Sequence, residues 1–154
     1  MGVAMSDDDD GSRGIDLQNG PGFIIGSMSF TQDELDYLAE QRIGRLATQA
    51  PDGTLQVSPV GFSYNAELGT IDIGGFNMTR SRKYRNVAAN GRAAFVVDDI
   101  VSTDPWRVRC LEIRGTGAVE GELIRITPGR IISFGLDKAD VEPHKLRADS
   151  RDVR

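Results

Sequence analysis

The sequence is poor in the residues from which most metal and nucleophile sites are built. Its 154 residues include one cysteine, Cys110, and one histidine, His144. A lone cysteine excludes an internal disulfide, and neither residue has the companions that a zinc site needs. His144 lies in a polar stretch, where a solvated surface role is the simpler interpretation. We therefore expect no metal site and no histidine-based nucleophile site, and a reducing compartment such as the cytoplasm.

Long apolar runs are also missing. No stretch approaches the ~20 residues of a membrane span, and the first residues lack the basic-then-apolar order of a secretory signal. With 39% hydrophobic and 27% charged residues, the composition is that of an ordinary globular domain. We expect one soluble, cytoplasmic domain with no membrane partner.

The net charge of -5 is unevenly distributed. Residues 1–27 contain five aspartates against Arg13, a balance of 1 − 5 = −4, and they show neither a helical nor a strand period. We expect this segment to be disordered, or a remnant of cloning that ends before Met28. The folded domain is expected at residues 28–137, followed by a polar C-terminal tail at 138–154.

Two short helices are predicted. Thr31 and Glu34 have the spacing of a capping box, and apolar residues follow at helical spacing until Arg42. The second helix covers residues 79–91, with Thr79 or Ser81 as N-cap and a glycine at its end.

The rest of the chain has the pattern of short strands. A turn at residues 51–53 joins the first two into a hairpin, the third continues a meander, and residues 92–101 are apolar enough for a strand buried on both faces. Six or seven strands with two helices predict a mainly β fold, a closed or split β-barrel. The expected strands cover residues 43–50, 54–65, 70–76, 92–101, 106–121, 123–126 and 129–136.

Charge of one sign is concentrated at the second helix. No acidic residue occurs between Asp72 and Asp98. Cations in the first turn of a helix oppose its dipole, and no carboxylate at i+3 or i+4 relieves their repulsion. A bound anion would reverse both penalties, so the segment predicts a phosphate site. The cations are Arg80, Arg82, Lys83, Arg85 and Arg92.

Two backbone features precede this helix. Gly74 and Gly75 end a strand, where a ligand can lie against bare backbone, and Pro59 must occupy an edge or a bulge. For each glycine alone, a simple turn or bulge is an equally good interpretation. Glycine-rich phosphate motifs are absent, and the domain is not basic enough, nor its aromatic residues suitably interleaved, for a nucleic-acid partner.

Three segments together resemble a known family. Residues 42–77, 79–99 and 104–117 are similar, in order and spacing, to the pyridoxamine 5'-phosphate oxidase-like split β-barrel oxidoreductases, specifically the group that uses the deazaflavin coenzyme F420. The resemblance covers residues 30–137. It implies an FMN-binding split barrel type of fold and a homodimer with two cofactor sites at the subunit interface.

The resemblance also implies roles for individual residues. Ser81, Arg82 and Lys83 would hold the cofactor phosphate, and Trp106 would wall the substrate side, although a half-buried aromatic at a strand end is an equally good interpretation. No catalytic side chain is assigned, because the cofactor supplies the chemistry. The residues that would border the ring and its side chain are Pro59, Val60, Gly61, Ile73, Gly74, Gly75 and Asn77.

The expected function is transfer of hydride between reduced F420 and a small unsaturated substrate. An FMN-dependent oxidoreductase of the same fold is the first alternative, and a non-enzymatic flavin- or haem-binding protein is the second. The arginine and histidine residues that bind substrate phosphate in true pyridoxamine 5'-phosphate oxidases have no match here, so that substrate is not expected. The connector at residues 119–122 is shorter than in other members of that family, which leaves open whether a substrate-side loop is missing between Gly121 and Glu122.

Overall fold

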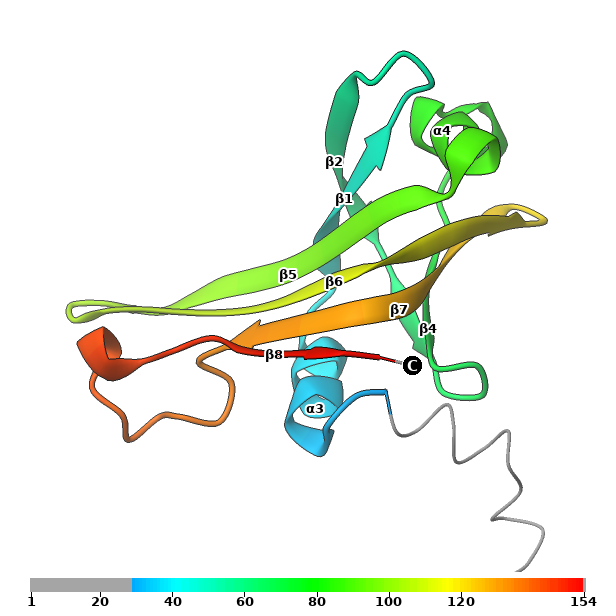
Figure 1. The fold of residues 1–154 in the computed structure, drawn as a ribbon. Coiled ribbons are helices and arrows are strands. Elements are labelled where there is room, and N and C mark those ends of the chain that lie inside the picture. The colour runs from blue at the N-terminus through cyan, green and yellow to red at the C-terminus, as the bar shows by residue number, and fades with distance from the viewer. Residues whose placement is uncertain (1–28, 154) are drawn as a thin grey trace, which may run out of the picture.

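The computed structural model describes residues 29–153, which form eight strands and two α-helices with two short 3-10 helices (Figure 1). The expectations for residues 1–27 therefore lie outside the described part of the chain. The helices are α3 Gln32–Glu40, η1 Met78–Arg80, α4 Arg82–Asn90 and η2 Pro143–Lys145. The strands are β1 Ile43–Gln49, β2 Leu55–Gly61, β3 Ser63–Asn65, β4 Thr70–Ile73, β5 Arg92–Thr103, β6 Trp106–Glu120, β7 Leu123–Phe134 and β8 Asp149–Asp152.

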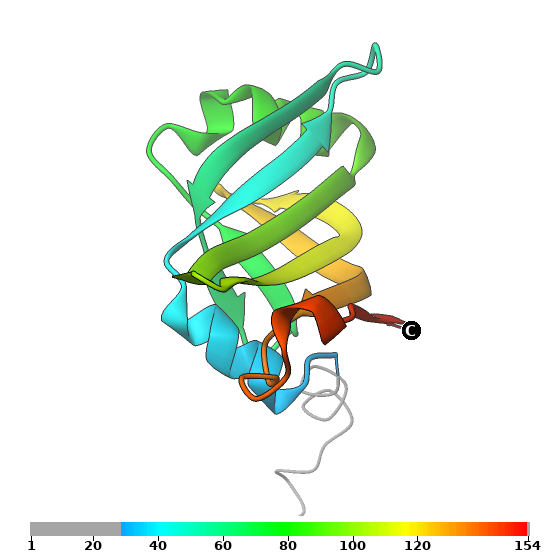
Figure 2. The same ribbon diagram turned by 90° about the vertical axis from the view of Figure 1, so that its left-hand side faces the viewer.

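All eight strands belong to one antiparallel sheet, with the order β2-β1-β5-β6-β7-β4-β3 and β8 paired to β7. Strands β2 and β3 follow each other in the chain with only Phe62 between them, yet they lie at opposite ends of that order. The sheet must therefore curl until its two ends meet at Phe62, as the end-on view shows (Figure 2). This confirms the mainly β split-barrel prediction.

The helix predictions are confirmed down to their caps. The Thr31 hydroxyl accepts from the Glu34 amide at 3.2 Å, and the Glu34 carboxylate accepts from the Thr31 amide at 3.0 Å, although α3 ends at Glu40 and not at Arg42. Helix α4 starts after Ser81, whose hydroxyl accepts from Tyr84 N, and stops at Gly91 with φ 70. Glycine reaches this left-handed conformation without steric cost.

Four strand expectations need correction. The run 54–65 does not lead into a simple meander, because it divides into β2 and β3, and β4 pairs with β3 and β7. Strand β5 is not buried on both faces, since only Phe95 and Val97 are buried. Residues 123–126 and 129–136 are not a strand pair but one strand, β7, which crosses a register shift at Pro128. The residues expected to be a polar tail contain β8, the eighth strand.

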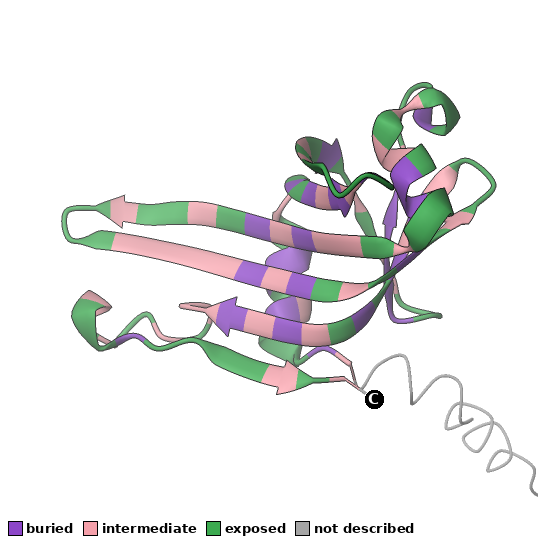
Figure 3. Ribbon diagram, turned by 45° about the horizontal axis from the view of Figure 1, so that its top comes forward, coloured by how far each residue is buried: buried purple, intermediate pink, exposed green. Residues whose placement is uncertain are grey.

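The core fills the inside of the curled sheet. Six isoleucines have 0% exposure, and Phe95, Leu46 and Leu111 complete the centre. Figure 3 shows buried residues concentrated in the middle of β5, β6 and β7. Helix α3 lies at one end of the barrel and α4 at the other (Figure 1). The six isoleucines are Ile71, Ile73, Ile113, Ile124, Ile126 and Ile131.

Beyond the core, β5 and β6 extend together as a long hairpin arm (Figure 1). The chain after β7 runs back along this arm, where the Arg107 guanidinium donates to the carbonyls of Lys138, at 3.0 Å, and Val141. Strand β8 then returns to β7, and Arg151 donates to both carboxylate oxygens of Glu34. The C-terminal segment is thereby fixed to α3. Among the described residues, no helix is both long and apolar enough to cross a membrane.

Candidate functional site

Four cations at the start of α4 lack acidic partners in the described chain. Arg80, Arg82, Lys83 and Arg85 form no ion pair within 4.0 Å with any carboxylate of residues 29–153, whereas six of the other ten described arginines do. The Arg82 charge acts weakly on Asp52, whose pKa is lowered mainly by the Thr54 amide and hydroxyl. Apart from this weak interaction, no carboxylate of residues 29–153 offsets the positive charge of the four cations.

Side-chain hydrogen bonds hold α4 across one end of the barrel. Asn86 donates to the Thr48 hydroxyl at 3.1 Å, and Asn90 donates to the Gln49 carbonyl at 2.7 Å, which ties the helix to β1. On its other side, the Tyr84 hydroxyl donates to the Gly121 carbonyl in the β6–β7 turn at 2.6 Å. These contacts fix the direction of the helix and hence the position of its positively charged first turn.

The first turn of α4 offers donors to an anion. The amides of Arg82 and Lys83 have no acceptor within the helix, as at the start of every α-helix. The Ser81 hydroxyl already donates to the Met78 carbonyl at 2.7 Å and accepts from Tyr84 N, so it contributes to the site first as a cap. Asn77 precedes this turn with φ 54 and an exposed side chain.

The end of β2 exposes backbone as the sequence predicted. Pro59 and Gly61 point outward, and an added Cβ at Gly61 would meet nothing within 4 Å. Val60, by contrast, is 6% exposed and points into the core, so only its backbone is available to a ligand. The segment is therefore a smooth outward wall interrupted by one bare glycine.

The end of β4 offers mainly backbone. The Ile73 side chain has 0% exposure, and Gly74 lies against Leu123, whose Cδ2 would be 3.1 Å from an added Cβ. Gly75 is exposed. Ser63 and Asp72 are the last pair of the β3–β4 ladder. Gly61 lies two residues before Ser63 and Gly74 two residues after Asp72, where the two chain segments separate.

A ligand that touched both α4 and the end of β2 would have to be elongated. Asn86 contacts Gln56 of β2 at 3.5 Å, and Pro59 and Gly61 lie three and five residues further along that strand. At the usual rise of a strand, these steps correspond to about 10 and 17 Å. A ring at one end and a phosphate at the other match this separation.

Two residues near the site were missed by the sequence reasoning. Phe76 is 96% exposed, the largest exposure among the large apolar residues described, and it lies between Gly75 and Asn77. Ser58 has a buried hydroxyl oxygen without a hydrogen-bond partner in the described chain. An aromatic residue after a glycine pair was a usable signal for Phe76, whereas the sequence contains no signal for the state of Ser58.

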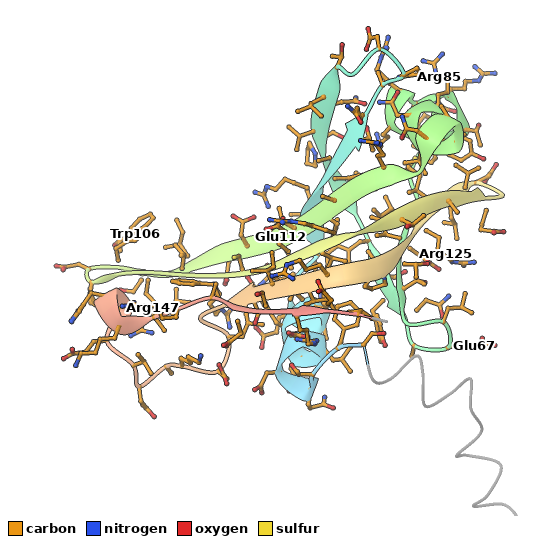
Figure 4. All side chains as sticks on the ribbon, in the orientation of Figure 1. Glu67, Arg85, Trp106, Glu112, Arg125 and Arg147 are labelled. Atoms are coloured by element: carbon orange, nitrogen blue, oxygen red, sulfur yellow. The ribbon has the colours of Figure 1, made fainter. Side chains whose placement is uncertain are left out.

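Trp106 is not brought to this site within one chain. It pairs with Thr103 at the far end of β5, whose first residue, Arg92, follows α4. Twelve strand residues correspond to roughly 36 Å. In Figure 4, Trp106 lies at the tip of the arm and Arg85 on α4, at opposite ends of the molecule.

Trp106 nevertheless shares a face of the sheet with Pro59 and Gly61. The register places Val57 beside Ala47 and Ala94, and Pro59 beside Arg45 and Val96. Since side chains two residues apart share a face, this outer face continues along the arm to Ile100, Val108 and Trp106. Its large exposed apolar residues are Leu55 78%, Val57 67%, Trp106 60%, Ile100 55% and Ile43 51%.

The titratable groups of the described residues include no cluster of metal ligands and no activated cysteine. No group of three or more potential metal ligands occurs among residues 29–153. Burial raises the pKa of the Cys110 thiol, which disfavours a reactive thiolate. His144 is exposed on η2 beside Glu142 at 3.5 Å.

Comparison with known proteins gives consistent matches. The sequence model of the family described as pyridoxamine 5'-phosphate oxidase matches residues 30–123. A relative from Streptomyces rimosus subsp. rimosus, named 5a,11a-dehydrotetracycline/5a,11a-dehydrooxytetracycline reductase, is 45% identical over 122 residues, which cover 71% of this chain and 86% of the relative.

Two solved structures share the fold. The conserved hypothetical protein Rv2991 from Mycobacterium tuberculosis has a TM-score of 0.59 at 18% identity, with 73% of this chain and 89% of that one covered. The FAD binding protein from Mycobacterium smegmatis has a TM-score of 0.52 at 17% identity, with 68% and 93% covered. At these identities the likeness concerns the fold alone.

Proposed function

The chain belongs to the pyridoxamine 5'-phosphate oxidase family, and from this premise we propose that it is a reductase that transfers hydride from reduced coenzyme F420 to a small unsaturated substrate. That it is an oxidoreductase follows from the 45% identity to a named reductase. The observation that carries the choice of a phosphorylated ring cofactor is the group of four cations at the start of α4 that pair with no described carboxylate, together with the bare backbone at the end of β2.

The residues of the chain bind and orient. Lys83 and Arg82 neutralise the cofactor phosphate, and the amides of the first turn of α4 donate to it. Pro59 and Gly61 border the ring, while Gly74 and Gly75 approach its side chain through backbone, as does Asn77. A bound reduced F420 would supply hydride chemistry for reduction of the substrate double bond, with the accompanying proton taken from water.

FMN is the closest competing cofactor, because its phosphate would use the same cations. A haem- or flavin-carrying protein without turnover is a second alternative. Haem binding is disfavoured by the positions of Cys110, in the middle of β6, and of His144, on η2 away from α4. Titration of the purified protein with F420, FMN and haem, followed by absorbance and fluorescence, separates the three.

The first substrate to test is 5a,11a-dehydrotetracycline, which the Streptomyces rimosus relative is named for reducing. We expect oxidation of one reduced F420 for each double bond reduced, measured by loss of the reduced cofactor and by mass spectrometry of the product. The proposal is contradicted if neither F420 nor FMN binds tightly. It is also contradicted if F420 binds but no enone acceptor is reduced.

A homodimer with the cofactor between the copies is part of this proposal. The outer face carries five exposed large apolar residues together with Pro59 and Gly61, so a second copy packed there would also cover the ring. The same outer face continues along the hairpin arm to Trp106. A second copy would therefore be able to bring its own Trp106 towards a site that the first copy cannot reach with that residue.

Replacing Val57 with aspartate tests the dimer. The side chain is 67% exposed, so the monomer should fold, but a buried carboxylate at the interface should shift the protein towards monomer. Leu68→Asp is the matched control, because Leu68 is 50% exposed in the β3–β4 turn, away from that face. Light scattering after size exclusion measures both. A monomeric parent protein that binds cofactor normally would exclude the dimer.

A further inference from the structure

A hollow of about 470 Å³ lies between α3 and the junction of β2 with β3. Its volume falls within the 300–1,000 Å³ that is usual for small-molecule pockets. Leu35, Phe62 and Tyr64 give it an apolar wall that packs against the core. The full lining is Leu35, Leu38, Ala39, Gln41, Arg42, Phe62, Ser63 and Tyr64.

This hollow adjoins the backbone that borders the cofactor ring in the proposed function. Ile43 and Gly61 are the last pair of the β1–β2 ladder. Arg42 and Phe62 are the next residue outward on each segment, and both line the hollow. A molecule in the hollow therefore starts one residue away from Gly61, where an added Cβ would meet nothing within 4 Å.

Arg42 gives the hollow an uncompensated positive charge. It is exposed and forms no ion pair within 4.0 Å with any described carboxylate. Three of the four acidic groups of α3 are engaged elsewhere, since Glu40 pairs with Arg109 at 3.3 Å and Asp36 accepts from Gln32 at 2.8 Å, and the fourth, Asp33, lines a different hollow. Glu34 is held by Arg151 at the other end of the helix. An acidic group on a ligand would find Arg42 without a competitor.

We infer that this hollow binds the substrate, and that the substrate is a flat ring compound bearing an ionised acidic group. The inference rests on the proposed function and names its substrate class. The rings lie on Leu35, Phe62 and Tyr64, and the Arg42 guanidinium donates to the acidic oxygens, a planar pairing for which arginine is well suited. This arrangement directs the reactive double bond towards Gly61 and the cofactor ring beyond it.

Two fluorescent probes test the hollow without any cofactor. Anilinonaphthalene sulfonate combines fused rings with an anion, and N-phenylnaphthylamine has the same rings without charge. We expect Arg42→Gln to weaken sulfonate binding about tenfold and to leave binding of the neutral probe unchanged, since one charge-assisted contact is lost. Arg147→Gln is the matched control, because Arg147 lies in the C-terminal segment and donates only to nearby carbonyls.

A second variant separates the hollow from other apolar surfaces. Ala39 is exposed on α3 and lines the hollow, so Ala39→Trp should fill it and weaken both probes while Arg42 is retained. With an anionic enone substrate, Arg42→Gln should raise KM and leave the dissociation constant of the cofactor unchanged. Sulfonate binding that is equal in the parent and Arg42→Gln overturns the inference, as does binding insensitive to Ala39→Trp.

These outcomes can be distinguished from failure of the proposed function. Lys83→Ala should leave the affinity for both probes unchanged, because Lys83 lies on α4 at the other end of the barrel. If Arg42→Gln weakens binding of the sulfonate probe but neither F420 nor FMN binds, the inference about the hollow is supported and the cofactor assignment is wrong. If F420 binds and is turned over but Arg42→Gln leaves the affinity for the sulfonate probe unchanged, the inference about the hollow is wrong.

Discussion

Replacing Lys83 with alanine should weaken cofactor binding by about 10- to 100-fold, the range expected for one charge-assisted contact to a phosphate. Lys83 is partly buried in the first turn of α4, and no described carboxylate competes for its ammonium group. The loss should therefore appear as cofactor affinity and not as stability. Fluorescence titration of F420 gives the dissociation constant, and thermal unfolding shows whether the fold is retained.

Salt gives an independent measure of the same contact. Raising ionic strength should weaken cofactor binding to the parent protein more than to Lys83→Ala, since exposed charges are screened and the variant has one fewer. Lys145→Ala is the control, because Lys145 is exposed on η2 and pairs with Glu142 at 2.8 Å. Equal affinity in the parent and Lys83→Ala would show that the cations at α4 do not hold the phosphate.

The parts of this site that lie within one short segment were predictable from sequence. The cap at Ser81, the stop at Gly91 and the crowding of Arg82 with Lys83 depend on neighbours within four residues, and the structure reproduces the predicted caps. Helix capping is local chemistry, so spacing alone carries the information.

Features that depend on strand pairing were less accessible. The curl of the sheet at Phe62 arises because β2 and β3 join opposite ends of the strand order, which no local pattern records. Strand β8 was hidden for a similar reason: its residues are polar, and it is an edge strand held by β7 and by the ion pair of Arg151 with Glu34. Edge strands commonly carry charged side chains, which makes them resemble loops.

The hollow beside Gly61 was missed because its walls come from separate segments. Arg42 ends the connection after α3, whereas Phe62 follows β2, and only the pairing of Ile43 with Gly61 brings them side by side. Trp106 is the opposite case: its strand was predicted, but its separation from α4 became clear only from the length of the arm. Predicting either would have required the register of the whole sheet.

The largest stability effect is expected at Asp72, which joins β4 to β7. Its carboxylate, 10% exposed, accepts from the Arg125 guanidinium twice at 2.9 Å, from Asn65 at 3.1 Å and from the Thr70 hydroxyl at 3.0 Å. Asp72→Asn removes the charge and leaves Arg125 without its partner. We expect a loss of about 2 to 3 kcal/mol in the free energy of unfolding, or roughly 10 °C in Tm.

The dependence on pH identifies the cause of that loss. Burial alone would raise the pKa of Asp72, but the hydrogen bonds from Arg125, Asn65 and Thr70 outweigh it and hold the pKa below the usual 3.8. A lowered folded-state pKa contributes stability above the unfolded-state value, and this contribution disappears as the pH falls through the folded-state pKa. The difference in stability between the parent and Asp72→Asn should therefore be full at neutral pH and narrow below about pH 4.

Asp152→Asn is the control for this dependence on pH. The Asp152 carboxylate is 72% exposed and pairs with Arg130, so the substitution should change Tm little at either pH. Ile71 and Ile73 flank Asp72 in β4 and are fully buried. If the stability difference between the parent and Asp72→Asn stayed constant with pH, packing of these side chains, and not the ion pair, would hold β4 in place.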